Sequence, residues 1–176
     1  MATAERYCLF DTAFGLCGIA WGERGLTRVQ LPEADGTATR ARLEKRGAVE
    51  TEPPQAVSEA IALLRAYFDG AETDFSGLVV DLPADTSDQR RRIYDAARAL
   101  RWGTTASYGE VARRAGLAGE ARVVGQAMAA NPLPIVIPCH RVMAAGDRLG
   151  GFSAYGGTLT KERLLVLERT LLPLLH

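Results

Sequence analysis

The residues best able to do chemistry stand together in the run Pro138-Cys139-His140-Arg141-Val142. A thiol becomes a good nucleophile when it ionises, and a nearby imidazole or cation lowers its pKa. Cys139 beside His140 and Arg141 therefore has the ingredients of an activated thiolate. Because adjacent side chains do not normally face each other, we expect His140 to act through a bridging water, with a carboxylate elsewhere orienting its other nitrogen. In isolation, such a Cys-His pair is more often an inert buried thiol beside a surface histidine.

Two short helices are expected before this run. Ser107-Tyr108-Gly109-Glu110 has the form of a capping box, so a helix should begin there and end at Gly116. A second helix should extend from Glu120 to Ala130, where Asn131-Pro132 ends it. Short helices joined by a tight, glycine-containing turn are the sequence form of a helix-turn-helix.

The second of these helices has little side-chain bulk around a single charge, Arg122. Its small residues are Ala121, Gly125, Ala127, Ala129 and Ala130. Such a helix can approach another surface closely, although small residues more often serve tight packing inside a protein. The surrounding arginines favour a nucleic acid as the partner.

Further helices are expected on either side of this region. After Ser87, apolar residues repeat at helical spacing from Ile93 to Leu100 beside several arginines. The glycine-rich residues 150–157 could let backbone amides approach a ligand, although a plain connecting loop has the same composition. Helical periodicity resumes from Lys161 to Leu172 and predicts a closing helix.

The first half of the chain is organised differently. Apolar runs over residues 7–10, 16–21 and 26–31, separated by turns, predict an antiparallel meander. The spacing of apolar residues from Val57 to Phe68 predicts a helix, and Phe75 to Leu82 is expected to be a further strand. Cys8 and Cys17 lie within the strand-like runs, where buried structural thiols are expected rather than nucleophiles.

Composition and charge exclude several classes of protein. With 176 residues, 47% hydrophobic and 24% charged, the composition is that of an ordinary globular protein. No apolar run approaches the length that spans a bilayer, and the first residues lack the pattern of a secretory signal. Three cysteines and two histidines suit neither a disulfide framework nor the usual zinc ligand sets, so we expect a cytoplasmic protein without a metal. The near absence of lysine suggests a GC-rich, bacterial genome.

The formal net charge of zero hides a division between the halves. Residues 1–84 carry 8 basic and 13 acidic side chains, whereas residues 85–176 carry 13 basic and 8 acidic ones. The second half is therefore the candidate for binding an anionic partner. Solvated faces whose charges happen to segregate would give the same division.

Taken in order, the motifs of the second half resemble those of the O6-alkylguanine-DNA alkyltransferases. They are Ser107–Glu110, Ala121–Gly125, Asn131-Pro132, Pro138–Val142, Gly151–Ser153 and Lys161 through Glu168. The resemblance implies an α+β protein, with a ribonuclease-H-like α/β domain over residues 1–84 and a mainly helical, winged-helix-like domain with a helix-turn-helix over residues 85–176.

The resemblance also implies the reaction. An alkyl group would pass from O6 of a guanine, with O4-alkylthymine as a further candidate substrate, irreversibly to Cys139, once per molecule and without a cofactor. A thiolate is the soft nucleophile that such a displacement needs. Related proteins that recognise the lesion without reacting carry tryptophan where this chain has Cys139. A Cys-His hydrolase is the other alternative, but it leaves the helix-turn-helix and the positive half unexplained.

Motif positions assign a role to each catalytic residue. Tyr108 would donate a proton to guanine N3, His140 would be the water-linked base, Glu168 would orient it, and Asn131 would brace the turn before the active site. Pocket residues carried over in the same way are Pro134, Met128, Val142, Phe152, Ser153 and Arg141. The loop between Phe152 and Lys161 is two residues longer than in the shorter family form, and no counterpart of some relatives' zinc ligands is present.

The partner implied is double-stranded DNA, bound by a monomer through the minor groove, with no membrane involved and with action at the nucleoid. A base inside the duplex is unreachable, so it must be rotated out, and Arg122 would fill the gap. The small residues of the helix around Arg122 would let it enter a groove only about 6 Å wide. Arginines expected to contact phosphates are Arg90 to Arg92, Arg113 and Arg114.

Overall fold

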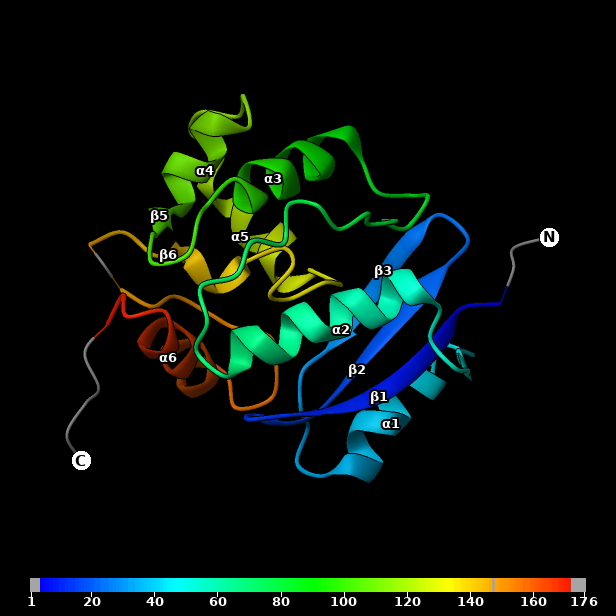
Figure 1. The fold of residues 1–176 in the computed structure, drawn as a ribbon. Helices are drawn as coiled ribbons and strands as arrows, with labels where there is room; N and C mark the ends of the chain where they lie inside the picture. The colour runs from blue at the N-terminus through cyan, green and yellow to red at the C-terminus, as the bar shows by residue number, and fades with distance from the viewer. Residues whose placement is uncertain (1–3, 147, 172–176) are drawn as a thin grey trace. The chain divides into compact units, whose positions relative to one another are not determined.

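A computed structural model describes residues 4–146 and 148–171, which form two compact units (Figure 1). The first unit contains the chain up to Ala84 together with Pro132–Val136, and the second contains Asp85–Asn131 and the chain from Ile137 onward. The short segment Pro132–Val136 thus leaves the second half of the sequence and joins the first unit, where the amide of Val29 donates to the carbonyl of Pro132 at 3.0 Å.

The first unit is built on a sheet of four strands in the order β3-β2-β1-β4. The strands are β1 (Arg6–Thr12), β2 (Gly15–Gly22), β3 (Gly25–Gln30) and β4 (Val49–Glu50). The first three are antiparallel, with Phe10 opposite Cys17, which confirms the predicted meander. The fourth pairs with β1 in parallel.

One helix packs on each face of this sheet (Figure 1). On one face, Leu43 of α1 (Gly36–Glu44) packs with Tyr7 and Ala20. On the other face, Arg65 of α2 (Gln55–Phe68) lies over the ring of Phe10. This division follows from the alternation of side chains along a strand. The helix α2 was predicted from its apolar spacing.

Residues 75–82, predicted as a strand, form none. Asp74 accepts from the amide of Ser76 at 2.9 Å, and the amide of Leu78 donates to the carbonyl of Phe75 at 3.1 Å, so the chain turns here. Only a single bridge joins Val80 to Leu26. The prediction failed because Asp74 and Gly77, both typical of turns, were not weighed against the apolar run.

The second unit is mainly helical. Its elements are α3 (Asp88–Arg98), β5 (Ala106–Ser107), α4 (Tyr108–Arg114), α5 (Ala121–Ala129), the 3-10 helix η1 (Cys139–Arg141), β6 (Val142–Met143) and α6 (Thr158–Leu167). Strands β5 and β6 pair in parallel, so the start of α4 lies beside the end of η1. The predicted helices are confirmed, except that α6 ends at Leu167; Leu172 lies outside the described residues.

Local capping explains where these helices begin and end. The hydroxyl of Ser87 accepts from the amide of Arg90, and that of Ser107 accepts from the amide of Glu110, both at 3.1 Å. Gly116, with φ +75°, ends α4 in a left-handed conformation that glycine adopts without strain. These caps fix the first turn of α4, which carries Tyr108.

Helix α5 is anchored to α3 through one buried hydrogen bond. The hydroxyl of Tyr94 donates to the carbonyl of Ala127 at 2.9 Å, and the Ala127 side chain is fully buried. Val124 and Met128 lie on the same buried face of α5. One face of α5 is therefore committed to packing, and the opposite face is exposed. Within the described residues, no helix has the length and apolar character that crossing a membrane requires.

We expect the substitution Ser107→Ala to lower the free energy of unfolding by about 1 kcal/mol, because the amide of Glu110 loses its acceptor at the start of α4. Urea denaturation of the two proteins measures the difference. Ser58→Ala, an exposed position within α2, is the matched control and should change stability by less than about 0.5 kcal/mol. Equal effects of the two substitutions would contradict the capping role.

Candidate active site

A cavity of about 260 Å³ lies within the second unit. It is lined by Tyr108, Gly125, Met128, Ala129, Cys139, Gly151, Phe152 and Ser153. The lining comes from α4, α5, η1 and the loop that precedes α6, so four separate segments of the second unit meet around the Cys139 thiol. Of the predicted pocket residues, Met128, Phe152 and Ser153 line this cavity, as do the predicted catalytic residues Cys139 and Tyr108.

Cys139 is held at the first position of η1 by a tight turn. Its amide donates to the carbonyl of Ile137 at 2.8 Å, and the side-chain amide of Asn131 donates to the same carbonyl at 2.8 Å. The Asn131 side chain also hydrogen-bonds the thiol. Asn131 thus links the end of α5 to the turn that presents Cys139.

The environment of the thiol differs from the one that the sequence suggested. Burial raises the pKa of Cys139, and the hydrogen bond from Asn131, the positive charge of Lys161 and nearby backbone amides only partly oppose that effect. The resting side chain is therefore a neutral thiol. The side chains adjacent in sequence, His140 and Arg141, are not the groups that lower its pKa.

His140 and Arg141, which follow Cys139 in η1, form a buried cluster with Glu168. The ring nitrogen Nε2 of His140 lies 2.7 Å from Oε1 of Glu168. The Nε of Arg141 donates to both Glu168 carboxylate oxygens, at 3.1 and 3.0 Å, and its Nη2 donates to Oε1 at 2.8 Å. A fourth bond, from Nη1 of Arg141 to the carbonyl of Leu100 at 2.7 Å, joins the cluster to the chain after α3.

The charges of this cluster follow from its geometry. Burial acts to raise the pKa of Glu168, but the hydrogen bonds from His140 and Arg141 outweigh it and lower that pKa to about 2. Burial lowers the pKa of His140, against the opposing effect of Glu168. Glu168 is thus an anion neutralised by Arg141, and His140 is a neutral imidazole able to accept a proton.

Arg141, expected in the pocket from its motif, is not among the residues that line this cavity. Its guanidinium is turned toward Glu168 and the Leu100 carbonyl, and it does not line the cavity. The Val142 side chain is fully buried, and its carbonyl, the group through which the resemblance assigns it to the pocket, accepts from Lys161. Pro134 belongs to the segment of the first unit, so the second unit described by itself does not contain it.

Tyr108 stands at the start of α4 with its phenol in the cavity wall. Burial raises its pKa, and negative charge on Cys139 would raise it further, so the phenol stays protonated as a donor. Gly150, with φ +70°, passes so close that a Cβ there would lie 2.8 Å from the Tyr108 hydroxyl. Glycine is required at this position because any side chain would displace the phenol.

The exposed face of α5 contains Arg122, Ala129 and Ala130, while Ala121 and Gly125 are partly exposed. Ala127, predicted to face DNA, is fully buried, and its carbonyl is bonded by Tyr94 of α3. Its position in the helix places it on the face with Val124 and Met128. Gln126 lies on the exposed face and was not singled out from the sequence.

Sequence reasoning also missed the part played by Lys161 of α6. Its side chain is fully buried, and its ammonium donates to the carbonyl of Val142 at 2.7 Å and to that of Gly151 at 3.4 Å. A signal was present in the sequence: Lys161 and Glu168 share the helical spacing of the buried Leu164 and Leu165. Two charged residues on an apolar stripe indicate buried, partnered charges.

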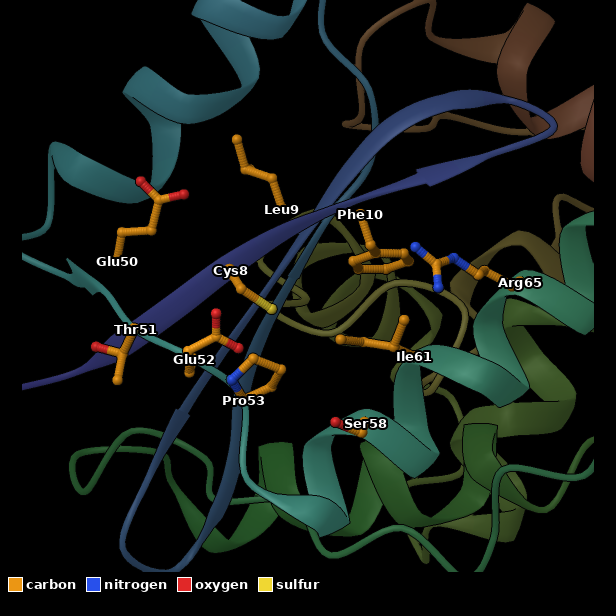
Figure 2. A pocket seen from close by; sticks show the side chains of 10 residues that line it. All are labelled: Cys8, Leu9, Phe10, Glu50, Thr51, Glu52, Pro53, Ser58, Ile61 and Arg65. Carbon is orange, nitrogen blue, oxygen red and sulfur yellow. The ribbon is translucent and has the colours of Figure 1, made fainter.

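A second cavity lies in the first unit, and Figure 2 shows its lining, with the Cys8 thiol beside Glu52 and Pro53. Burial, together with the negative charges of Glu50 and Glu52, raises the pKa of Cys8 to about 11. Cys17, on β2, has its pKa raised by burial to about 12. Neither thiol has the buried His-Glu pair that begins at the residue after Cys139. Within the described chain, no three His, Cys, Asp or Glu side chains gather as a metal site.

Two family models match the chain. Residues 6–82 match the ribonuclease-like domain of 6-O-methylguanine DNA methyltransferase, and residues 88–170 match its DNA binding domain. A methylated-DNA–protein-cysteine methyltransferase of Methanothermobacter thermautotrophicus is 36% identical over 151 residues, covering 86% of this chain and 78% of that protein. One of Mycobacterium tuberculosis is 41% identical over 124 residues, covering 70% and 72%.

Solved structures give the same result. The crystal structure of Mycobacterium tuberculosis OGT in complex with DNA has a TM-score of 0.75 at 33% identity, covering 94% of this chain and 93% of that one. The O6-methylguanine-DNA methyltransferase from the archaeon Pyrococcus kodakaraensis has a TM-score of 0.67 at 22% identity, which supports the fold alone. The predicted α+β class, with its ribonuclease-like and DNA-binding parts, is confirmed.

We expect Glu168→Gln to lower the free energy of unfolding at pH 7 by about 3–5 kcal/mol, because Arg141 would remain as a buried, uncompensated cation. Glu162→Gln on the same helix is the control and should change it by less than about 0.5 kcal/mol.

The same substitution tests the charge of Glu168. A carboxylate whose pKa is depressed to about 2 contributes stability above its unfolded pKa and loses that contribution as the pH falls toward 2. The difference between the wild type and Glu168→Gln, measured by denaturant titration, should therefore shrink below about pH 4. A difference that is constant with pH would contradict an ionised Glu168.

Proposed function

Because the chain belongs to the 6-O-methylguanine DNA methyltransferase family, its activity is methyl transfer from methylated DNA to a protein cysteine, and we propose that Cys139 is the acceptor. The observation that carries this assignment is the placement of Cys139 and the Tyr108 phenol in the wall of one cavity, with the buried His140–Glu168 pair beginning at the next residue. Cys8 and Cys17 lie on strands of the first unit.

The reaction follows from the protonation states. The Cys139 proton passes through a water to neutral His140, and Glu168 stabilises the resulting imidazolium. The sulfur attacks the alkyl carbon, so that a C–S bond forms as the bond from carbon to guanine O6 breaks. The electron pair stays on the departing base, and Tyr108 donates a proton to guanine N3. The thioether product has no route back to a thiol, so each molecule reacts once.

A thiol that is neutral at rest suits this sequence of events. Burial keeps Cys139 protonated, which limits its reaction with other electrophiles while the cavity is empty. Transfer then depends on a lesion that is held against the sulfur with a proton donor on its other side. This requirement confines the chemistry to a base that fits the cavity between Tyr108 and Phe152.

The same proposal includes the way in which DNA is bound. The protein would bind the duplex as a monomer, and the exposed face of α5, with its small residues, would enter the minor groove. Arg122 would occupy the space left by the rotated base. Arg113 and Arg114 at the end of α4 are exposed and suited to phosphate contacts. Because the proposed substrate is a lesion in chromosomal DNA, the protein would act at the nucleoid, in the cytoplasm of a bacterial cell.

We expect Cys139→Ser to abolish transfer of a labelled methyl group from duplex DNA containing O6-methylguanine while binding of that duplex is retained. A serine hydroxyl is a far weaker nucleophile, yet it leaves the cavity walls in place. Cys8→Ser and Cys17→Ser are matched controls and should transfer at the wild-type rate. Residual methyl transfer by Cys139→Ser, or loss of methyl transfer in either control, would mean that another cysteine is the acceptor.

We expect Arg122→Ala to slow transfer from duplex DNA by about tenfold or more, because nothing then fills the vacated stack. Reaction with free O6-benzylguanine should be unchanged, since that substrate needs no base rotation. Arg24→Ala in the first unit, an exposed arginine, controls for the loss of one positive charge. Equal losses on the duplex and on the free base would rule out the gap-filling role.

A further inference from the structure

Two cations are buried beside the catalytic cysteine, but only one of them has a carboxylate partner. Arg141 is neutralised by Glu168 through three hydrogen bonds. No ion pair between described residues includes Lys161, whose two hydrogen bonds go to neutral carbonyls. A buried ammonium without a counter-ion is costly, so its retention needs a reason.

The two carbonyls that Lys161 binds belong to two different segments near the cavity. Val142 follows η1, the short helix that carries Cys139, and Gly151 lies in the loop with Phe152 and Ser153. The ammonium also lies 6.0 Å from the centroid of the Tyr108 ring. Lys161 therefore lies among the segments that surround the thiol.

We propose that Lys161 is the counter-ion of the Cys139 thiolate and that it joins the η1 segment to the loop wall of the cavity. It is a positioning residue, because it acts through Cys139 and the two carbonyls rather than on the alkyl group. The inference rests on the proposed role of Cys139 as the acceptor.

The other charged and titratable groups of this region do not supply that counter-charge. Burial favours the neutral imidazole of His140, and Glu168 holds the charge of Arg141. Tyr108 is a protonated phenol. In the transfer reaction the imidazolium formed on His140 is held by Glu168, and Lys161 is the cation whose charge acts on the Cys139 sulfur. The coupling appears in both partners: the charge of Lys161 lowers the pKa of Cys139, and a Cys139 thiolate raises that of Lys161.

The coupling gives the thiol a distinctive pH dependence. Burial lowers the pKa of Lys161 to about 8, so the ammonium is present below that pH and is lost above it. Below pH 8, the wild-type thiolate is stabilised by a charge that a neutral substitute lacks. Above pH 8 this advantage disappears, since Lys161 gives up its proton while Cys139 is still a thiol. The wild-type profile should therefore flatten near pH 8, whereas that of a neutral variant should not.

The test is the rate of alkylation of Cys139 by iodoacetamide between pH 6 and 10, followed by peptide mass spectrometry, in the wild type and in Lys161→Gln. Glutamine keeps hydrogen-bond donors for the carbonyls but removes the charge. We expect alkylation of Cys139 in Lys161→Gln to be about tenfold slower at pH 7, with the difference vanishing above pH 8. Alkylation of Cys8 in the same molecules is the internal reference and should not change.

Two further variants complete the experiment. Lys45→Met removes the only other lysine, which is exposed, and should behave as the wild type. Lys161→Arg restores the charge and should recover the rate at pH 7 to within about threefold, even if Lys161→Gln folds poorly. A wild-type pH profile in Lys161→Gln, or no recovery in a folded Lys161→Arg, would overturn the proposal. Because iodoacetamide needs no DNA, failure here is distinct from a failure of DNA methyl transfer.

Discussion

The site depends on the burial of Glu168 against Arg141 and His140. A carboxylate without solvent must be paired, and three hydrogen bonds from one guanidinium meet that requirement. The same contacts join the end of α6 to η1, and the bond from Arg141 to the Leu100 carbonyl extends them to the chain after α3. The ion pair between Arg141 and Glu168 thus fixes η1, which carries Cys139, against the end of α6.

The consequence is a site in which Lys161 is, among the described residues, the one charged group without a carboxylate partner until the reaction begins. Glu168 and Arg141 cancel, His140 is neutral, and burial keeps Cys139 protonated. Charge separates only when the thiol gives up its proton, and then Lys161 is close enough to stabilise the sulfur. A buried thiol of this kind can be stable in the cell and still be a strong nucleophile at the moment of transfer, because its activation comes from fixed neighbours.

Much of this was predictable from the sequence, and the failures have physical causes. Caps and apolar spacing identified the helices, but α1 was missed because it buries only Thr39 and Leu43 and so shows almost no amphipathic pattern. Adjacency in sequence located the reactive run but not the direction of each side chain, so Arg141 was placed in the pocket rather than on Glu168. The buried face of α5 is the one that packs on α3, where Tyr94 binds the Ala127 carbonyl. The composition of α5 alone does not show which face this is.

The central claim is that Cys139 becomes the methyl acceptor in a reaction that occurs once. The most direct measurement is the intact mass of the protein after incubation with excess duplex containing O6-methylguanine, with peptide mapping to locate the added mass. The account predicts the mass of one methyl group on every chain, saturating at one and located on Cys139. Methyl on Cys8 or Cys17, or an unmodified protein that consumes the lesion repeatedly, would contradict it.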